Sequence, residues 1–96
     1  MSLEITDSKN TYYASGKKKT WVGYRADGTK ASEATYWENG NVKTRIGYQS
    51  DGVTKRIEIT CWENGNDKML IEYESDGTKK SGYPKYYEED GITELK

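Results

Sequence analysis

The sequence contains no histidine, one cysteine and one proline, and these scarcities exclude several classes of protein. Without histidine the chain lacks the usual general base and the commonest zinc ligand, which excludes the usual His-containing triads and zinc sites. A single cysteine, Cys61, cannot form an internal disulfide. No apolar run approaches the ~20 residues that a membrane-spanning helix needs. We therefore expect a soluble chain, either cytoplasmic or in the cell envelope after removal of a signal segment.

Large aliphatic side chains are scarce as well. The 96 residues include 3 Leu, 6 Ile, 3 Val and no Phe, a content that by itself is typical of disordered chains. However, the net charge is only −1, and 9 Tyr and 3 Trp supply large, rigid surfaces for burial. The composition therefore predicts a single small domain over residues 1–96, with apolar contacts that are mainly aromatic.

An internal repeat is the clearest pattern in the sequence. The segments 13–24, 37–48 and 62–73 each begin with an aromatic residue, continue through a glycine and end at a tyrosine, and each is followed by Asp-Gly. A fourth copy opens at Tyr87. The chain therefore divides into repeats of 24–25 residues, at about 13–36, 37–61 and 62–86, with a partial repeat at 87–96.

Each repeat carries two turn signals, which predict one β-hairpin per repeat. Asn-Gly and Asp-Gly favour the positive φ of tight hairpin turns, and glycine or proline interrupts every window that could form a helix. We predict an all-β fold, a single twisted antiparallel meander of about eight strands. The expected strands are 10–14, 18–24, 30–37, 42–48, 54–62, 67–73, 79–87 and 92–95.

The lengths of the turns determine which side chains share a face of the sheet. We predict a two-residue turn at Asn39-Gly40, which pairs Trp37 with Val42, and a second one at Asp27-Gly28. One-residue insertions later in the chain indicate longer loops rather than slips of register. Three-residue loops with a glycine bulge are expected at 50–52, 75–77 and 89–91.

With these turns, one face of the sheet carries two aromatic ladders. The ladders are Tyr13, Trp37, Trp62 and Tyr87 in one case and Tyr24, Tyr48 and Tyr73 in the other. We expect the sheet to curl until one ladder is enclosed. Gly23 and Gly47 each precede a ladder tyrosine, and a bare backbone there would let a neighbouring ring lie across it.

The repeat unit combines an aromatic residue, Glu-Asn-Gly, a basic-polar strand, Gly-Tyr and Asp-Gly. It is present in 36–43 and 62–68 and more loosely in 82–91. This pattern resembles the MORN repeat, more closely its bacterial variant class, whose members include antitoxin-like proteins. The resemblance covers residues from about 10 to 95. It implies serial antiparallel hairpins in an elongated sheet, used as a scaffold or binding surface, sometimes beside membranes or other domains.

The residues that could carry chemistry favour structural explanations. Cys61 lies in the middle of a predicted strand with no histidine to deprotonate it, which favours a small apolar strand residue over a nucleophile. The acidic run 88–90 is typical of a solvated turn, and no Glu follows the Asp-Gly pairs at the spacing of a calcium loop. We therefore expect no catalytic residue, no cofactor and no metal.

Basic residues interleaved with aromatic ones, as around Lys17-Lys18-Lys19, are typical of proteins that bind single-stranded nucleic acid. Here 16 acidic residues slightly outnumber 15 basic ones, so we expect no nucleic-acid partner. The same balance leaves contact with an anionic membrane as a weakly supported alternative.

The sequence thus favours a non-enzymatic β-repeat module that acts as a protein-interaction scaffold, with another protein as partner. An alternative is an antitoxin-like or envelope-associated protein that neutralises one dedicated partner. Open sheet edges also allow a homodimer. Whether the ladder rings form the core or the binding surface stays open at this point. The candidate surface residues are Tyr24, Trp37, Tyr48, Trp62, Tyr73 and Tyr87.

Overall fold

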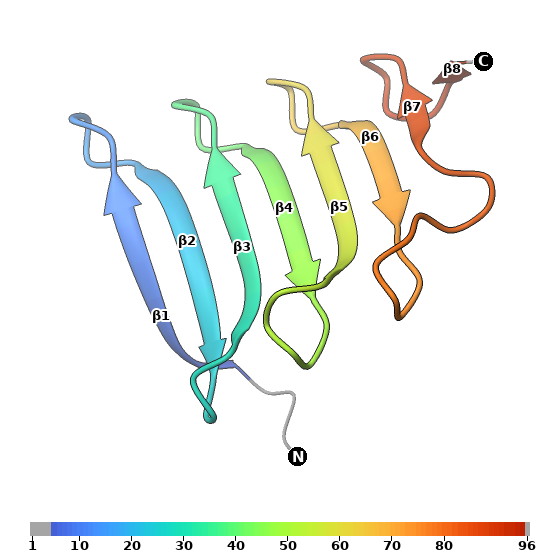
Figure 1. The fold of residues 1–96 in the computed structure, drawn as a ribbon. Helices are drawn as coiled ribbons and strands as arrows, with labels where there is room; N and C mark the ends of the chain where they lie inside the picture. Colours follow the sequence, from blue (N-terminus) through green and yellow to red (C-terminus); the bar gives the residue numbers. More distant parts are fainter. Residues whose placement is uncertain (1–4, 96) are drawn as a thin grey trace.

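The computed structural model describes residues 5–95, which form one open antiparallel sheet (Figure 1). The eight strands lie side by side in chain order, and none of these residues is helical, which confirms the predicted all-β meander. The strands are β1 (Ile5–Tyr12), β2 (Lys18–Arg25), β3 (Lys30–Tyr36), β4 (Val42–Tyr48), β5 (Lys55–Cys61), β6 (Asp67–Glu72), β7 (Lys85–Tyr87) and β8 (Glu94–Leu95).

The two outer parts of the sheet differ from the prediction. β1 begins five residues before the expected strand, because pairing with β2 extends from Tyr12 back to Ile5. The expected strand 79–87 is interrupted, and only β7 and an isolated bridge between Tyr73 and Lys79 remain. Between them Gly82 has a φ of 86° and Pro84 has no N–H to donate, so neither continues the ladder.

The hairpin turns are one residue longer than most of the predicted ones. In the second repeat, the Trp37 N–H donates to the Asn41 carbonyl at 2.8 Å and the Gly40 N–H donates to the Trp37 carbonyl at 2.9 Å. These bonds enclose a three-residue loop, 38–40, so the predicted two-residue turn is wrong, and Val42 pairs with Tyr36 instead of with Trp37. An Asn-Gly turn of type I′ needs positive φ at both central residues, whereas only glycines have positive φ in residues 5–95. The turn at Gly28 follows the same pattern.

As predicted, the insertions lengthen loops and leave the register intact. The Gln49 N–H donates to the Thr54 carbonyl, and the Glu88 N–H donates to the Thr93 carbonyl, which gives four-residue loops at 50–53 and 89–92. The loop 75–77 has its predicted three residues. Equivalent side chains therefore stay in rows across the strands, as in the row Thr11, Thr20, Thr35, Thr44 and Thr60.

The sheet forms a single thin layer, and its extents are 40 × 40 × 15 Å. It stays open, so the expectation that it curls around one aromatic ladder is wrong. Among the described residues no large side chain is fully buried, because no second layer covers either face. The buried apolar residues are Ala31, Ala34, Tyr48, Cys61 and Ile71.

Candidate binding surface

The two aromatic ladders lie at opposite ends of the strands. The turns at 13–17, 37–41, 62–66 and 88–93 form what we call the first-turn edge, at the upper side of Figure 1. The turns at 25–29, 49–54 and 74–78 form the second-turn edge. Trp37 and Trp62 lie at the first-turn edge, and Tyr24, Tyr48 and Tyr73 lie at or next to the second-turn edge. The six candidate residues therefore do not form one continuous patch.

At the first-turn edge, each ring contacts the following repeat through its polar atom. The indole N–H of Trp37 donates to the Cys61 carbonyl at 3.4 Å, and that of Trp62 donates to the Tyr87 carbonyl at 3.3 Å. In the first repeat the Tyr13 hydroxyl donates to the Tyr36 carbonyl at 2.5 Å. The rings therefore connect adjacent hairpins in the same manner in three successive repeats.

Tyr87 does not belong to this ladder. In the earlier repeats the backbone N–H of the ladder residue closes the turn, whereas in the fourth repeat the backbone N–H of Glu88 does so. Tyr87 takes the place of Tyr36 and Cys61, and its carbonyl accepts the indole hydrogen bond of Trp62. The prediction that Tyr87 is equivalent to Trp62 is therefore wrong by one position. The extra residue of the fourth repeat lies in the four-residue loop 89–92.

Two lysines cover the ladder tryptophans. The ammonium of Lys43 lies 4.7 Å from the centroid of the Trp37 ring, and that of Lys68 lies 4.6 Å from the Trp62 ring. Each of these cation–π contacts contributes about 0.5–1 kcal/mol at an exposed site. Both indoles are half-buried, so each presents part of its ring beside a positive charge.

Asparagine side chains connect the turns along the same edge. The side-chain amides of Asn39 and Asn41 donate to the Glu63 carbonyl at 2.7 and 2.8 Å. Those of Asn64 and Asn66 donate to the Glu89 carbonyl in the same way, both at 2.8 Å. The turns are therefore fixed relative to one another. A shallow hollow lies between them, lined by Trp37, Cys61, Trp62, Glu63, Asn64, Lys68 and Glu89.

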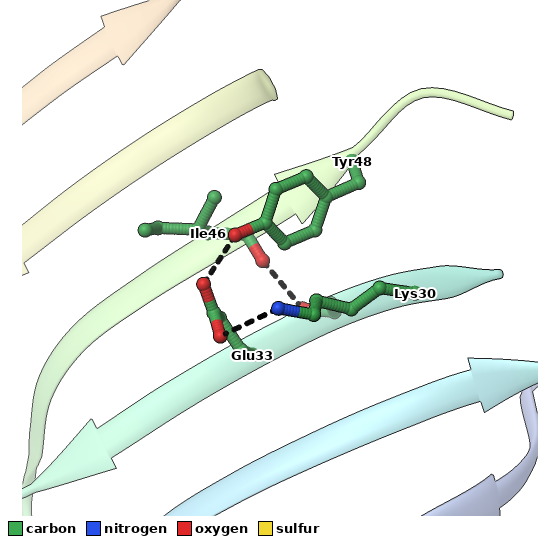
Figure 2. A network of polar contacts seen from close by, with 5 residues as sticks. Lys30, Glu33, Ile46 and Tyr48 are labelled. Atoms are coloured by element: carbon green, nitrogen blue, oxygen red, sulfur yellow. Dashed lines mark hydrogen bonds and ion pairs between the residues drawn. The ribbon is translucent and has the colours of Figure 1, made fainter. Parts of the chain in front are cut away.

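Near the second-turn edge, the hydroxyls of Tyr48 and Tyr73 are bound to carboxylates on the neighbouring strands. Figure 2 shows the Tyr48 hydroxyl donating to Glu33, whose other oxygen lies 3.5 Å from the Lys30 ammonium. Burial, followed by the hydrogen bond to Glu33, raises the pKa of Tyr48 to about 12. Only 9% of Tyr48 is exposed, so its ring contributes mainly to packing.

A similar arrangement recurs one repeat later, and in both cases the lysine and glutamate partners of the ladder tyrosine were not predicted. The Tyr73 hydroxyl donates to Glu58 at 2.9 Å, and the Lys55 ammonium lies 3.0 Å from the same carboxylate oxygen. Burial and this bond raise the pKa of Tyr73 to about 12. The spacing Lys-x-x-Glu, present at both 30–33 and 55–58, is the sequence signal that could have revealed these networks.

The two strand glycines accommodate different neighbours. At Gly23 a ring lies across the backbone as predicted, because an added Cβ would meet the Trp21 ring at 2.7 Å. At Gly47 the prediction of a ring is wrong. The group over Gly47 is the guanidinium of Arg56, 2.8 Å from the position of an added Cβ.

Cys61 is buried at the end of β5, and its Sγ lies 3.8 Å from a carboxylate oxygen of Asp67. Burial raises the pKa of the thiol, and the charge of Asp67 raises it further. The protonated thiol is therefore favoured, which is opposite to what a nucleophile needs. Within residues 5–95 there is no cluster of three or more His, Cys, Asp or Glu side chains suited to a metal ion.

Comparison with known proteins finds no family model and no curated protein that matches this chain. The part of the chain that the structure describes contains no helix long and apolar enough to cross a membrane. The functional assignment therefore depends on the geometry of the surface.

Proposed function

We propose that the protein is a non-enzymatic β-repeat module that serves as a protein-interaction scaffold, with the first-turn edge as its contact surface. The observation that carries this proposal is the equivalent placement of Trp37 and Trp62. Each indole is half-buried, lies beside a lysine and donates its N–H to the next hairpin. Tryptophan held in a well-packed environment is among the residues that most often dominate protein–protein binding energy.

The hydrogen bonds between turns support the same proposal. Because Asn39, Asn41 and the two indoles already fix this edge, little side-chain entropy remains to be lost when a partner binds. We also propose that the chain is a MORN-like repeat protein. The resemblance of its repeat unit to MORN repeats implies a scaffold role. Burial raises the pKa of the Cys61 thiol, which argues against this residue as a nucleophile.

Site-specific photo-crosslinking in the native cell tests the proposal. A photo-reactive phenylalanine analogue is placed at position 37, at position 62 or at the control position Val53, which lies in a second-turn loop and is 78% exposed. We expect positions 37 and 62 to capture the same protein and position 53 to capture none or a different one. Capture of the same set from all three positions, or no capture at 37 and 62, would contradict the proposal.

A binding assay with purified components then separates binding from folding. Trp37→Ala and Trp62→Ala should each weaken capture of the identified partner while the variants still unfold cooperatively near the melting temperature of the parent chain. If both variants lose the fold instead, the tryptophans serve as the core of the sheet and the contact surface lies elsewhere.

A further inference from the structure

A second hollow lies at the second-turn edge, away from Trp37 and Trp62. Two arginines line it, Arg25 at the end of β2 and Arg56 near the start of β5. Ser50 and Ser75, from the two adjoining loops, also line it.

Arg25 is the only buried charged residue in the described part of the chain, and 6% of it is exposed. Its guanidinium donates to the backbone carbonyls of Lys30, Tyr48 and Gln49, at 3.0–3.3 Å, and to the Thr29 hydroxyl at 3.2 Å. Among residues 5–95, its Nε has no hydrogen-bond partner and none of the ion pairs involves Arg25. The hydrogen-bond partners of this buried positive charge are thus all neutral, which is costly.

The next repeat shows that the structural role of Arg25 needs no charge. Gln49 occupies the equivalent position, directly after the ladder tyrosine. Its neutral amide donates to the Glu74 carbonyl at 2.8 Å and to the Lys55 carbonyl at 3.3 Å, so it connects adjacent second turns as Arg25 does. The charge of Arg25 is therefore additional to what the fold requires.

Arg56 provides the second charge of the hollow. It is exposed, and its guanidinium lies over the bare backbone of Gly47, where a Cβ would be 2.8 Å from Nη2. Like Arg25, it takes part in none of the ion pairs found in residues 5–95. Glycine at position 47 thus leaves the space in which this guanidinium lies.

The remaining charges at the hollow do not neutralise the two arginines. Lys80 is 3.6 Å from Glu72 and is paired, and Glu74 is the acidic residue on the rim. Asp27 and Asp51 lie in the adjoining turns, but each carboxylate accepts hydrogen bonds from its own turn. Those turn bonds, before the charge of Arg25, lower the pKa of both aspartates.

We propose that this hollow binds an oxyanion group between Arg25 and Arg56. Guanidinium groups bind phosphate and carboxylate oxygens through paired, charge-assisted hydrogen bonds, and the Ser50 and Ser75 hydroxyls are further donors at the rim. Ile5 and Ala31 also line the hollow, so it can accept an apolar group attached to the anion. This proposal is independent of the contact surface at the first-turn edge.

The test titrates the full chain with inorganic phosphate and with phenyl phosphate at constant ionic strength, followed by amide chemical shifts. We expect saturable shifts at residues that line the hollow. Arg56→Gln and Arg25→Gln should each weaken binding by about tenfold or more, the value of one charged hydrogen bond. Arg25→Gln copies the Gln49 arrangement, so we expect it to fold. Arg45→Gln, an exposed arginine outside the lining, is the matched control for charge.

A further variant separates geometry from charge. Gly47→Ala keeps both arginines but displaces the Arg56 guanidinium, and should weaken binding as well. Tighter binding of phenyl phosphate would support an organic ligand, and equal binding would support free phosphate. The proposal is overturned if sodium chloride produces the same shifts or if Arg45→Gln weakens binding as much as Arg56→Gln.

Discussion

The side-chain amide of Asn39 donates a hydrogen bond of 2.7 Å to the backbone carbonyl of Glu63, in the next repeat. At the same time its Oδ1 accepts the backbone N–H of Asn41, within its own turn. One residue thus shapes a hairpin and connects it to its neighbour, which explains why an amide is suited to this position in both complete Asn-Gly-Asn turns.

The two roles of Asn39 can be separated by Asn39→Asp. A carboxylate can still accept the Asn41 N–H, but it cannot donate to Glu63, so the bond from residue 39 to the next repeat is lost while the one from Asn41 remains. We expect a loss of about 0.5–1.5 kcal/mol in the free energy of unfolding, measured by urea denaturation. Ser15→Asp adds the same charge at the equivalent position of the first turn, where the described contacts include no bond to the next repeat. An equal loss in both variants would mean that charge, not the lost bond, is responsible.

Gly23→Ala should destabilise the sheet through contact with Trp21. An added Cβ would lie 2.7 Å from two ring carbons of Trp21 and 3.1 Å from Ile5 Cδ1, so the indole has to move. We expect a cost of about 1–3 kcal/mol, accompanied by a change in tryptophan fluorescence. In a Trp21→Ala background the same substitution should cost much less. Additive effects of the two substitutions would rule out the contact as the cause.

The repeat, the number of strands and the positions of most strands follow from the sequence because they depend on local signals. Glycine marks every hairpin turn, and the threonine row shows that the register between turns is kept. Loop lengths were less predictable. The Asn39-Gly40 pair suggested a two-residue turn. In the structure the backbone of Asn39 does not have positive φ, and its side chain accepts the Asn41 N–H within a longer loop.

Contacts between distant residues are the part of the site that the sequence did not reveal. The alignment could not show that Arg56, rather than a ring, lies over Gly47, because this depends on packing between β4 and β5. Similarly, Tyr87 aligns with Trp62 by residue type, and only the backbone hydrogen bond from Glu88 shows the shift by one position. The presence of an aromatic residue is therefore not enough to identify the ladder position in the last, partial repeat.

Cys61 should react slowly with thiol reagents in the folded protein. The thiol is buried, and its pKa is raised by burial and by Asp67, so little thiolate is available. We expect alkylation by iodoacetamide at mildly alkaline pH to be much slower in native buffer than in urea. Fast alkylation of the native chain, or a catalytic activity that is lost in Cys61→Ala, would contradict the structural role of this residue.

Tyr48 should make the fold sensitive to high pH. Its pKa is raised from 10.0 to about 12 in the folded protein, so between these values the folded state retains a proton that the unfolded state loses. The stabilisation is complete below pH 10.0 and decreases as the pH rises towards 12.

Glu33→Gln removes the carboxylate that accepts the Tyr48 hydroxyl, so the pKa of Tyr48 should fall and the loss of stability across this range should shrink. Urea unfolding as a function of pH, with tyrosinate absorbance, measures both effects. Glu38→Gln removes the same charge from an exposed turn and should leave the profile unchanged; an identical change in both variants would mean that overall charge, and not the bond to Tyr48, sets the pH dependence.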